Sequence, residues 1–325
     1  MDSLRVVFMG TPDFAVPTLQ ALIDGPHEVV GVFCQPDKQK GRGKKVQMPP
    51  VKECALAADL AVYQPVTLRD EAAETLLRSL APDVIVVVAY GKILPPWLIR
   101  LPKYGCLNVH ASLLPKYRGA APIHWAILNG DRETGVTIMQ MNDGLDTGDM
   151  LETIPLTIKA GETTGELFDR IAPIGGEVIN EVLAKALAGS LQPVPQDDSQ
   201  ATYANKITKE MGALDWTRSA VALANQIRGL SPAPGCFTFL EAGKRIKVWQ
   251  ACAMANEVVK TKNISVTAGD PIPGTIIGVT EKSFLVATGE GVLEVLEVQP
   301  DNKKRMNAGD FCRGHQVKAG LILNA

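Results

Sequence analysis

Apolar and polar residues follow two different periods along the first 160 residues of the chain. Short runs that are apolar at nearly every position, many of them β-branched, occupy 4–9, 28–33 and 83–89. Such runs are typical of strands buried on both faces of a sheet. Between them, apolar residues recur at the three- and four-residue spacing of helices, at 14–23, 51–60 and 70–80.

This alternation continues beyond residue 100. It predicts strands at 105–109, 134–141 and 150–156, and helices at 120–128 and 164–187, the second interrupted near Pro173. Residues 35–50 show neither period and are expected to form a long loop. Alternating strands and helices favour an α/β fold with a doubly wound, mostly parallel, Rossmann-like sheet. Ligands of such sheets bind outside the carboxyl ends of the strands.

A polar, proline-containing stretch at 190–206 separates this region from the rest and is expected to be a linker. Beyond it, 205–229 has a partly helical pattern. Short β-type runs with Gly and Pro turns between them follow at 244–250, 274–279, 283–287 and 292–298. They are typical of a small antiparallel β-barrel of the OB type. We therefore expect an α/β domain at 1–189, a linker at 190–206 and a smaller C-terminal barrel domain at 207–325.

Composition narrows the class of protein. The chain has 325 residues, of which 46% are hydrophobic and 21% charged, and these values exclude a wholly disordered chain. The net charge is -2, but residues 207–325 carry 14 Lys and Arg against 11 Asp and Glu.

Six cysteines without a CxxC pair indicate reduced thiols and a cytoplasmic protein. No window approaches the roughly 18 apolar residues of a membrane span, so no membrane partner is expected.

Two common types of site do not fit the sequence. The first predicted strand ends at Gly10, but Pro12 occupies the second-glycine position of a GxGxxG dinucleotide site. The histidines have no metal-ligand spacing, so we expect no metal. They are His27, His110, His124 and His315.

Asn108 and His110 lie two residues apart at the end of a predicted strand, so their side chains project from the same face. An acyl-transfer site needs such a pair, a neutral donor where an oxyanion develops and a group that moves a proton. The alternative is a histidine with a purely structural role.

In the polar segment 143–149, one carboxylate could reach His110, fix its tautomer and stabilise its charged form. By itself, that segment is equally an ordinary hairpin loop.

Three motifs, taken together and in this order, resemble the formyltetrahydrofolate-dependent formyltransferases. They are Asn108-x-His110, the run Ser112-Leu113-Leu114-Pro115-x-Tyr117-x-Gly119, and Asp143-Gly144-x-Asp146-Thr147-Gly148. Other segments resemble the branch of that family that acts on initiator methionyl-tRNA, and the similarity covers nearly the whole chain. These segments are 8–15, Gln35-Pro36-Asp37, 41–44, 50–52, 206–207 and 214–216. Departures are mild: Cys34 stands where Thr is usual, and 231–235 replaces a more aromatic segment.

The resemblance implies that Asn108, His110 and Asp146 are catalytic. It implies a monomer that takes 10-formyltetrahydrofolate as the donor co-substrate, takes initiator methionyl-tRNA as the acceptor and needs no metal. The folate is expected to contact residues at the ends of two predicted strands. They are Val88, Ala89, Tyr90, Leu94, Ser112, Leu113, Leu114 and Pro115.

Basic residues in the 35–50 loop and at the start of the second domain are expected to contact tRNA. Cationic side chains that contact phosphates give salt-dependent binding, and glycines allow a loop to order on its partner. The alternative is an ordinary solvated surface. The candidates are Lys38, Lys40, Arg42, Lys44, Lys45, Lys206 and Lys209.

Other functions fit parts of the sequence. The same chemistry could serve glycinamide ribonucleotide or a sugar nucleotide as the acceptor. A hydrolase that deformylates the folate is expected to carry a further domain ahead of the catalytic one. A translation-associated RNA-binding protein with an inactive catalytic fold is the alternative from another class, and the presence of Asn108, His110 and Asp146 argues against it.

Overall fold

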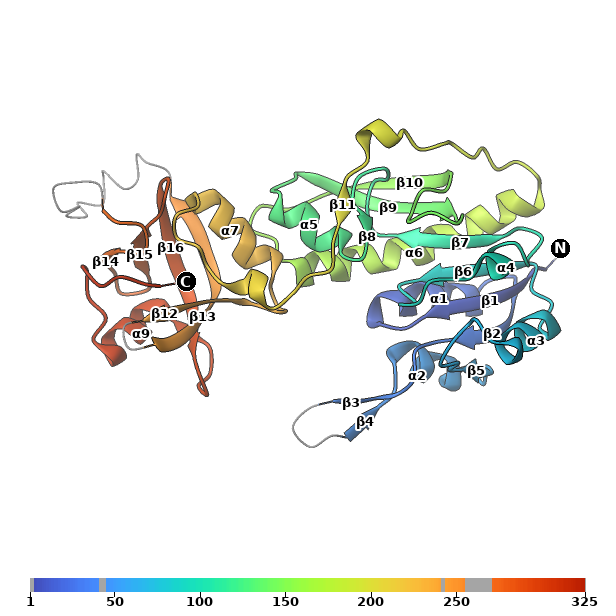
Figure 1. Cartoon of the computed structure of the whole chain (residues 1–325), viewed down its shortest axis with the longest axis horizontal. Coiled ribbons are helices and arrows are strands. Elements are labelled where there is room, and N and C mark those ends of the chain that lie inside the picture. The colour runs from blue at the N-terminus through green and yellow to red at the C-terminus, as the bar shows by residue number, and fades with distance from the viewer. Residues whose placement is uncertain (1–2, 41–44, 241–242, 255–270, 325) are drawn as a thin grey trace. The chain divides into compact units, whose positions relative to one another are not determined.

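The chain folds into two compact units, shown in a computed structural model that describes residues 3–40, 45–240, 243–254 and 271–324 (Figure 1). The first unit comprises residues 1–122, 133–157 and 168–204. The second comprises residues 123–132, 158–167 and 205–325. The division into continuous domains at 1–189 and 207–325 stays a prediction.

A mixed sheet forms the centre of the first unit, and the described residues contribute seven strands to it. In spatial order they are β10 (Met150–Thr157), β9 (Glu133–Gln140), β7 (Cys106–His110), β6 (Val84–Val88), β1 (Arg5–Gly10), β2 (Glu28–Phe33) and β5 (Val62–Tyr63). The strands from β7 to β5 run parallel, whereas β9 is antiparallel to both β7 and β10. The predicted doubly wound, mostly parallel sheet is confirmed.

Helices bury both faces of this sheet, which explains why every residue of β6 is buried. Val7, Ile85 and Val87 share one core cluster with Leu77 of a helix. On the opposite face, Gly175 lies so close to β7 that a Cβ there would be 2.7 Å from Cγ1 of Val109. The helices of this part of the chain are η1 (Asp13–Ala15), α1 (Val16–Ile23), α2 (Pro50–Ala57), α3 (Glu71–Ser79), α4 (Pro96–Ile99), α5 (Pro122–Leu128) and α6 (Thr164–Leu187).

Helix α6 is continuous, so the interruption expected near Pro173 does not occur. A proline removes one backbone donor and usually kinks a helix. Here Gly175 brings the helix close to Val109 of β7, and tertiary packing of this kind outweighs local propensity.

The expected loop at 35–50 instead contains a hairpin of β3 (Lys38–Lys40) and β4 (Lys45–Gln47), with Lys38 opposite Gln47. Lysines at alternate positions carry no apolar period, and that is why the sequence pattern missed these strands. At the base of the hairpin, Nζ of Lys52 donates to both carboxylate oxygens of Asp37 at 2.8–2.9 Å and to Oε1 of Gln64 at 2.8 Å. Hydrogen bonds from Lys52 and then Gln64 lower the pKa of Asp37 below its ordinary value.

The second unit is built on an antiparallel sheet. Its strands lie in the order β12 (Cys236–Leu240), β13 (Lys244–Met254), β16 (Val292–Pro300), β15 (Phe284–Ala287) and β14 (Ile276–Val279), and β17 (Met306–Asn307) pairs with β16. Helices α7 (Ala220–Gly229) and α9 (Ala308–His315) contribute to its core. The 3₁₀ turn η3 (Glu210–Gly212) precedes α7.

The C-terminal segment joins the two outer strands of this sheet. Asn324 and Phe239 of β12 exchange backbone hydrogen bonds at 2.9 Å. On the other side, the N–H of Ile276 in β14 donates to the carbonyl of Leu321 at 2.8 Å, and that of Leu323 donates to Gly274 at 2.9 Å. The predicted barrel is therefore confirmed, closed by a segment too short to show a period of its own. In the described part of the chain, no helix combines the length and the apolar character needed to cross a membrane.

Replacing Leu323 with Ala tests this closure, because the Leu323 side chain is only 3% exposed whereas its neighbour Ile322 is 38% exposed. We expect Leu323→Ala to lower the free energy of unfolding by about 2–5 kcal/mol, the usual cost of emptying a core leucine site. Ile322→Ala, the matched control, should cost much less. Urea unfolding followed by circular dichroism measures both, and equal losses would contradict the closure.

Candidate active site

Strand β7 and the loop between β9 and β10 bring together the three side chains that the sequence singled out. Asn108 and His110 project from the same face of β7, and Asp146 lies in the loop between β9 and β10. Oδ1 of Asp146 lies 3.4 Å from Nδ2 of Asn108, and Oδ2 lies 3.8 Å from Nδ1 of His110. The His110 and Asp146 side chains are 5% and 13% exposed. The amide, imidazole and carboxylate therefore converge in a largely dehydrated place.

The ring of His110 is oriented by a backbone group. Its Nε2 lies 3.0 Å from the carbonyl oxygen of Tyr117. A carbonyl oxygen only accepts hydrogen bonds, so Nε2 carries the proton in this contact. Nδ1 then faces Asp146 and is the nitrogen that can gain or lose a proton. Tyr117, rather than the expected carboxylate, fixes the tautomer.

Asp146 is held in a strained backbone conformation. Its φ of 51° lies in the left-handed region, as do those of Tyr117 at 62° and Ala89 at 46°. Conformations of this kind cost about 1–3 kcal/mol each and cluster at functional sites. The backbone N–H of Gly119 donates to Oδ2 of Asp146 at 2.7 Å, which holds the carboxylate beside His110.

The loop after β7 is stabilised by its own polar groups. The Ser112 hydroxyl is buried and donates to the carbonyl of Lys116 at 2.7 Å. Oγ1 of Thr137 donates to the carbonyl of Ser112 at 2.7 Å and accepts from the N–H of Leu114 at 3.2 Å. The Ser112 hydroxyl thus closes a turn. Of the neighbouring folate candidates, Leu114 is buried, whereas Leu113 and Pro115 are partly exposed.

The other folate candidates follow β6, the strand next to β7. Val88 ends that strand, Ala89 is exposed, and Tyr90 and Leu94 are buried in one core cluster. The carbonyl of Tyr90 accepts hydrogen bonds from Oγ1 of Thr11 at 2.9 Å and from Nε2 of Gln35 at 3.1 Å. This segment therefore lies at the carboxyl end of the sheet, where ligands of doubly wound folds bind.

Cys34 directly follows β2 and is buried in the same unit. Burial raises the pKa of Cys34 to about 11 and also raises the pKa of Tyr90. Both groups are therefore neutral near pH 7.

The candidate tRNA-binding residues belong to both units. Lys38 is the exposed first residue of β3, Lys40 ends the same strand, and Lys45 begins β4. Lys206 and Lys209 are exposed in the second unit. Arg42 and Lys44 lie outside the described residues.

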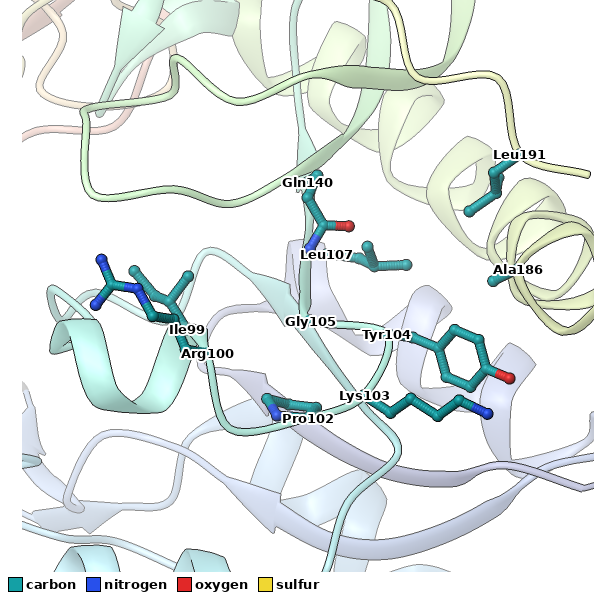
Figure 2. A pocket seen from close by; sticks show the side chains of 10 residues that line it. All are labelled: Ile99, Arg100, Pro102, Lys103, Tyr104, Gly105, Leu107, Gln140, Ala186 and Leu191. Carbon is teal, nitrogen blue, oxygen red and sulfur yellow. The ribbon is translucent and has the colours of Figure 1, made fainter. Parts of the chain in front are cut away.

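A cavity of about 400 Å³ lies near the start of β7, and His110 is not among the residues that line it (Figure 2). Gly105 and Leu107 line it together with Gln140 at the end of β9. It contains none of the residues singled out from the sequence. Within the described ranges, no group of three His, Cys, Asp or Glu side chains is arranged to hold a metal ion.

The sequence did not single out two residues beside the Asp146 loop. Gln196 donates to the carbonyls of Asp146 and Gly148, and Arg118 donates to Gln196. Arg118 stood at an unspecified position of a recognised motif, and Gln196 fell in the expected linker. Gln196 has no sequence signal, because a single glutamine between proline and aspartate residues is typical of a solvated segment.

Comparisons with known proteins give a consistent picture. The formyl transferase family model matches residues 4–183, and the model for the formyl transferase C-terminal domain matches residues 206–316. The chain is 46% identical over 320 residues to the methionyl-tRNA formyltransferase of Alkaliphilus oremlandii, covering 98% of this chain and 99% of that protein. It is 48% identical over 320 residues to the methionyl-tRNA formyltransferase of Magnetococcus marinus, covering 98% of each.

Solved structures show the same fold. An N-formyltransferase from Helicobacter canadensis, solved with folinic acid and dTDP-3-aminofucose, superposes with a TM-score of 0.64 at 15% identity, covering 90% of this chain and 99% of that one. HypX from Aquifex aeolicus in complex with tetrahydrofolic acid gives a TM-score of 0.57 at 14% identity, covering 96% of this chain and 47% of that one.

Gly148 tests how tightly the Asp146 loop packs. A Cβ at this position would lie 1.6 Å from the carbonyl oxygen of Gln140, so the backbone must move to accept one. We expect Gly148→Ala to lower the free energy of unfolding by about 1–3 kcal/mol, as overpacking usually does. The control is Gly314→Ala, whose added methyl meets nothing within 4 Å. Urea unfolding of both variants measures the difference, and a fully stable Gly148→Ala protein would contradict this packing.

Proposed function

This chain belongs to the formyl transferase family, in the branch of the methionyl-tRNA formyltransferases, and on that premise we propose that it formylates initiator methionyl-tRNA. The formyl group comes from 10-formyltetrahydrofolate and goes to the α-amino group of the methionine. The observation that carries the proposal is the convergence of Asn108, His110 and Asp146 at the carboxyl end of β7.

The acceptor amine needs positioning more than it needs a strong base. An α-amino group titrates near ~8, so a useful fraction is neutral at cellular pH. Holding it against the formyl carbon removes much of the entropic barrier. A new C–N bond forms, the bond from the formyl carbon to the folate nitrogen breaks, and one proton passes from the amine to that nitrogen.

In this proposal, Asn108 stabilises the oxyanion. Its Nδ2 is 3.4 Å from Asp146, which is long for a hydrogen bond, so this donor can be redirected toward a developing negative charge. His110 moves the proton through Nδ1, since Nε2 is engaged by Tyr117. Asp146, 3.8 Å away, stabilises the imidazolium that forms.

The folate contacts belong to the same proposal. Val88, Ala89, Tyr90 and Leu94 follow β6, and residues 112–115 follow β7, so both segments border the carboxyl ends of adjacent parallel strands. The exposed Ala89 and the partly exposed Leu113 and Pro115 support a contact surface there. The hydroxyl of Ser112 acts by holding the turn.

The tRNA contacts are proposed for the basic residues of both units. Lys38, Lys206 and Lys209 are exposed and suit phosphate contacts, and further lysines follow Lys38 in the sequence. RNA stems are recognised mainly through backbone and shape. We propose a cytoplasmic, monomeric enzyme, and six cysteines without a CxxC pair agree with a reducing compartment.

The reaction itself is tested by mass measurement of the methionine released from charged initiator tRNA after incubation with enzyme and 10-formyltetrahydrofolate. Glycinamide ribonucleotide and an amino-sugar nucleotide serve as competing acceptors. Formylation of the tRNA-bound methionine supports the proposal, and preference for either small acceptor would overturn it.

Asn108→Ala and Asp146→Ala test the assigned roles. Loss of one oxyanion donor typically costs ~10²–10³ in rate, and we expect each substitution to lower kcat by at least about that factor. The fold should be retained, as checked by circular dichroism. If folded Asp146→Ala transferred formyl groups at the wild-type rate, the assignment would be wrong.

Lys38→Ala tests the hairpin as a tRNA-binding element. We expect a higher KM for charged tRNA and an unchanged kcat. The salt slope, which is the dependence of log binding constant on log salt concentration, should fall by about 1, because each phosphate contact releases counterions. Lys318→Ala, at another exposed lysine, is the control. Identical KM values and salt slopes in the two variants would exclude a contact from Lys38.

A further inference from the structure

We propose that Gln196 is a positioning residue that holds Asp146 against His110, and that residues 194–204 form a strap of the active site. We define the strap as the chain segment from Val194 to Ala204. The inference rests on the proposed function and adds a residue and a segment to its machinery.

Gln196 spans the loop that carries Asp146. Its Nε2 donates to the carbonyl of Asp146 at 2.8 Å and to the carbonyl of Gly148 at 2.7 Å. One side-chain amide thus supplies both of its hydrogens to two backbone acceptors of the same loop. The contact is made to the backbone carbonyl of Asp146. It therefore restrains a residue whose φ of 51° is unfavourable for any residue with a side chain.

The orientation of this amide is settled by its other partner. Oε1 of Gln196 accepts from Nε of Arg118 at 3.0 Å and from Nη2 at 2.8 Å. An arginine only donates and carbonyl oxygens only accept, so Oε1 must face Arg118 and Nε2 must face the loop. Every polar atom of the Gln196 side-chain amide is therefore engaged.

Arg118 links Gln196 to a second residue of the strap. Its side chain is 3% exposed, and a buried charge is tolerated only when it is paired and hydrogen-bonded. Nη2 of Arg118 donates to Oδ1 of Asp198, a second strap residue, at 2.6 Å. The guanidinium of Arg118 therefore joins Gln196 to Asp198 within the strap.

The strap also contacts the loop that orients His110. The backbone N–H of Tyr117 donates to Oγ1 of Thr202 at 2.9 Å, and that of Arg118 donates to the carbonyl of Thr202 at 2.8 Å. The strap contains η2 (Asp198–Gln200) and β11 (Tyr203–Ala204), which pairs with β8 (Arg118–Gly119).

The strap is fastened at its other end as well. Met150, at the start of β10, exchanges two backbone hydrogen bonds with Val194 at 2.8 and 2.9 Å. The segment therefore joins the loop of Tyr117, which orients the imidazole, to the loop of Asp146, which faces Nδ1. It is a part of the site and not merely a spacer.

A loop in a strained conformation relaxes when its restraint is removed. A displacement of about 1 Å at a reacting group can cost about 10²-fold in rate. Removing the Gln196 donors should therefore lower kcat while leaving the substrate-binding surfaces in place.

The test compares Gln196→Glu and Gln196→Met with wild type, using charged initiator tRNA and 10-formyltetrahydrofolate. Gln196→Glu keeps an acceptor for Arg118 but loses the donors to the loop, and Gln196→Met removes both without adding charge. For each, we expect kcat to fall by about 10–100-fold with both KM values within about threefold of wild type. Gln192→Glu, an exposed glutamine four residues earlier, is the control and should behave as wild type.

Coupling to Asp146 separates positioning from general stabilisation. If Gln196 acts through Asp146, the double variant Gln196→Met/Asp146→Ala is no slower than Asp146→Ala, because effects on one unit are not additive. The inference would be overturned if the rate losses of the two single variants multiplied in the double variant. It would also be overturned if folded Gln196 variants kept the kcat of an active wild-type enzyme.

Amide exchange gives a readout that does not depend on activity. The N–H of Gly119 donates to Asp146, so we expect it to exchange faster in Gln196→Met, whereas the N–H of Gly130, bonded to Ile127, keeps its wild-type rate. Unchanged exchange at Gly119 would overturn the inference. A wild-type protein that formylates no charged tRNA would overturn the proposed function instead, and exchange at Gly119 would still decide the role of Gln196.

Discussion

The position of the Asp146 carboxylate is the constraint on which the rest of the site depends. One oxygen accepts from the N–H of Gly119 at 2.7 Å and faces His110, and the other lies near Asn108. A carboxylate in a dehydrated place interacts strongly with a neighbouring cation. In the proposed mechanism, this carboxylate stabilises the imidazolium that forms while His110 carries the proton, and the Gly119 contact holds the carboxylate in place.

The sheet explains how the Asp146 loop must run. β9 runs antiparallel to β7, with Thr137 opposite His110. The β9–β10 loop therefore leaves the sheet near the start of β7, at the end opposite to His110. The loop must fold back along the sheet to bring Asp146 to His110, and Gly148 permits this by passing the carbonyl of Gln140 without a side chain. A returning loop of this kind needs fixed points at both ends, which the contact of Asp146 with Gly119 and the strap provide.

Much of this was predictable from residue pattern, and the exceptions share a physical cause. β6 and β2 were predicted because buried β-branched runs carry a strong signal, and Asn108 and His110 because strand periodicity puts them on one face. The hairpin β3–β4, the closing segment at 321–324 and Gln196 were missed. The hairpin is short and polar, the closing segment is held by backbone hydrogen bonds, and Gln196 is held by side-chain hydrogen bonds. The partners of the last two are distant in sequence, and local periodicity contains no information about such partners.

The charge of Asp146 is the most direct point at which to test the account. Asp146→Asn preserves the size of the side chain and an oxygen that can accept from Gly119, but it removes the negative charge beside Nδ1 of His110. Single-turnover transfer from 10-formyltetrahydrofolate to charged initiator tRNA isolates the chemical step. The account predicts a rate at least about 10²-fold below wild type in a folded variant that still binds both substrates. A wild-type single-turnover rate would contradict it.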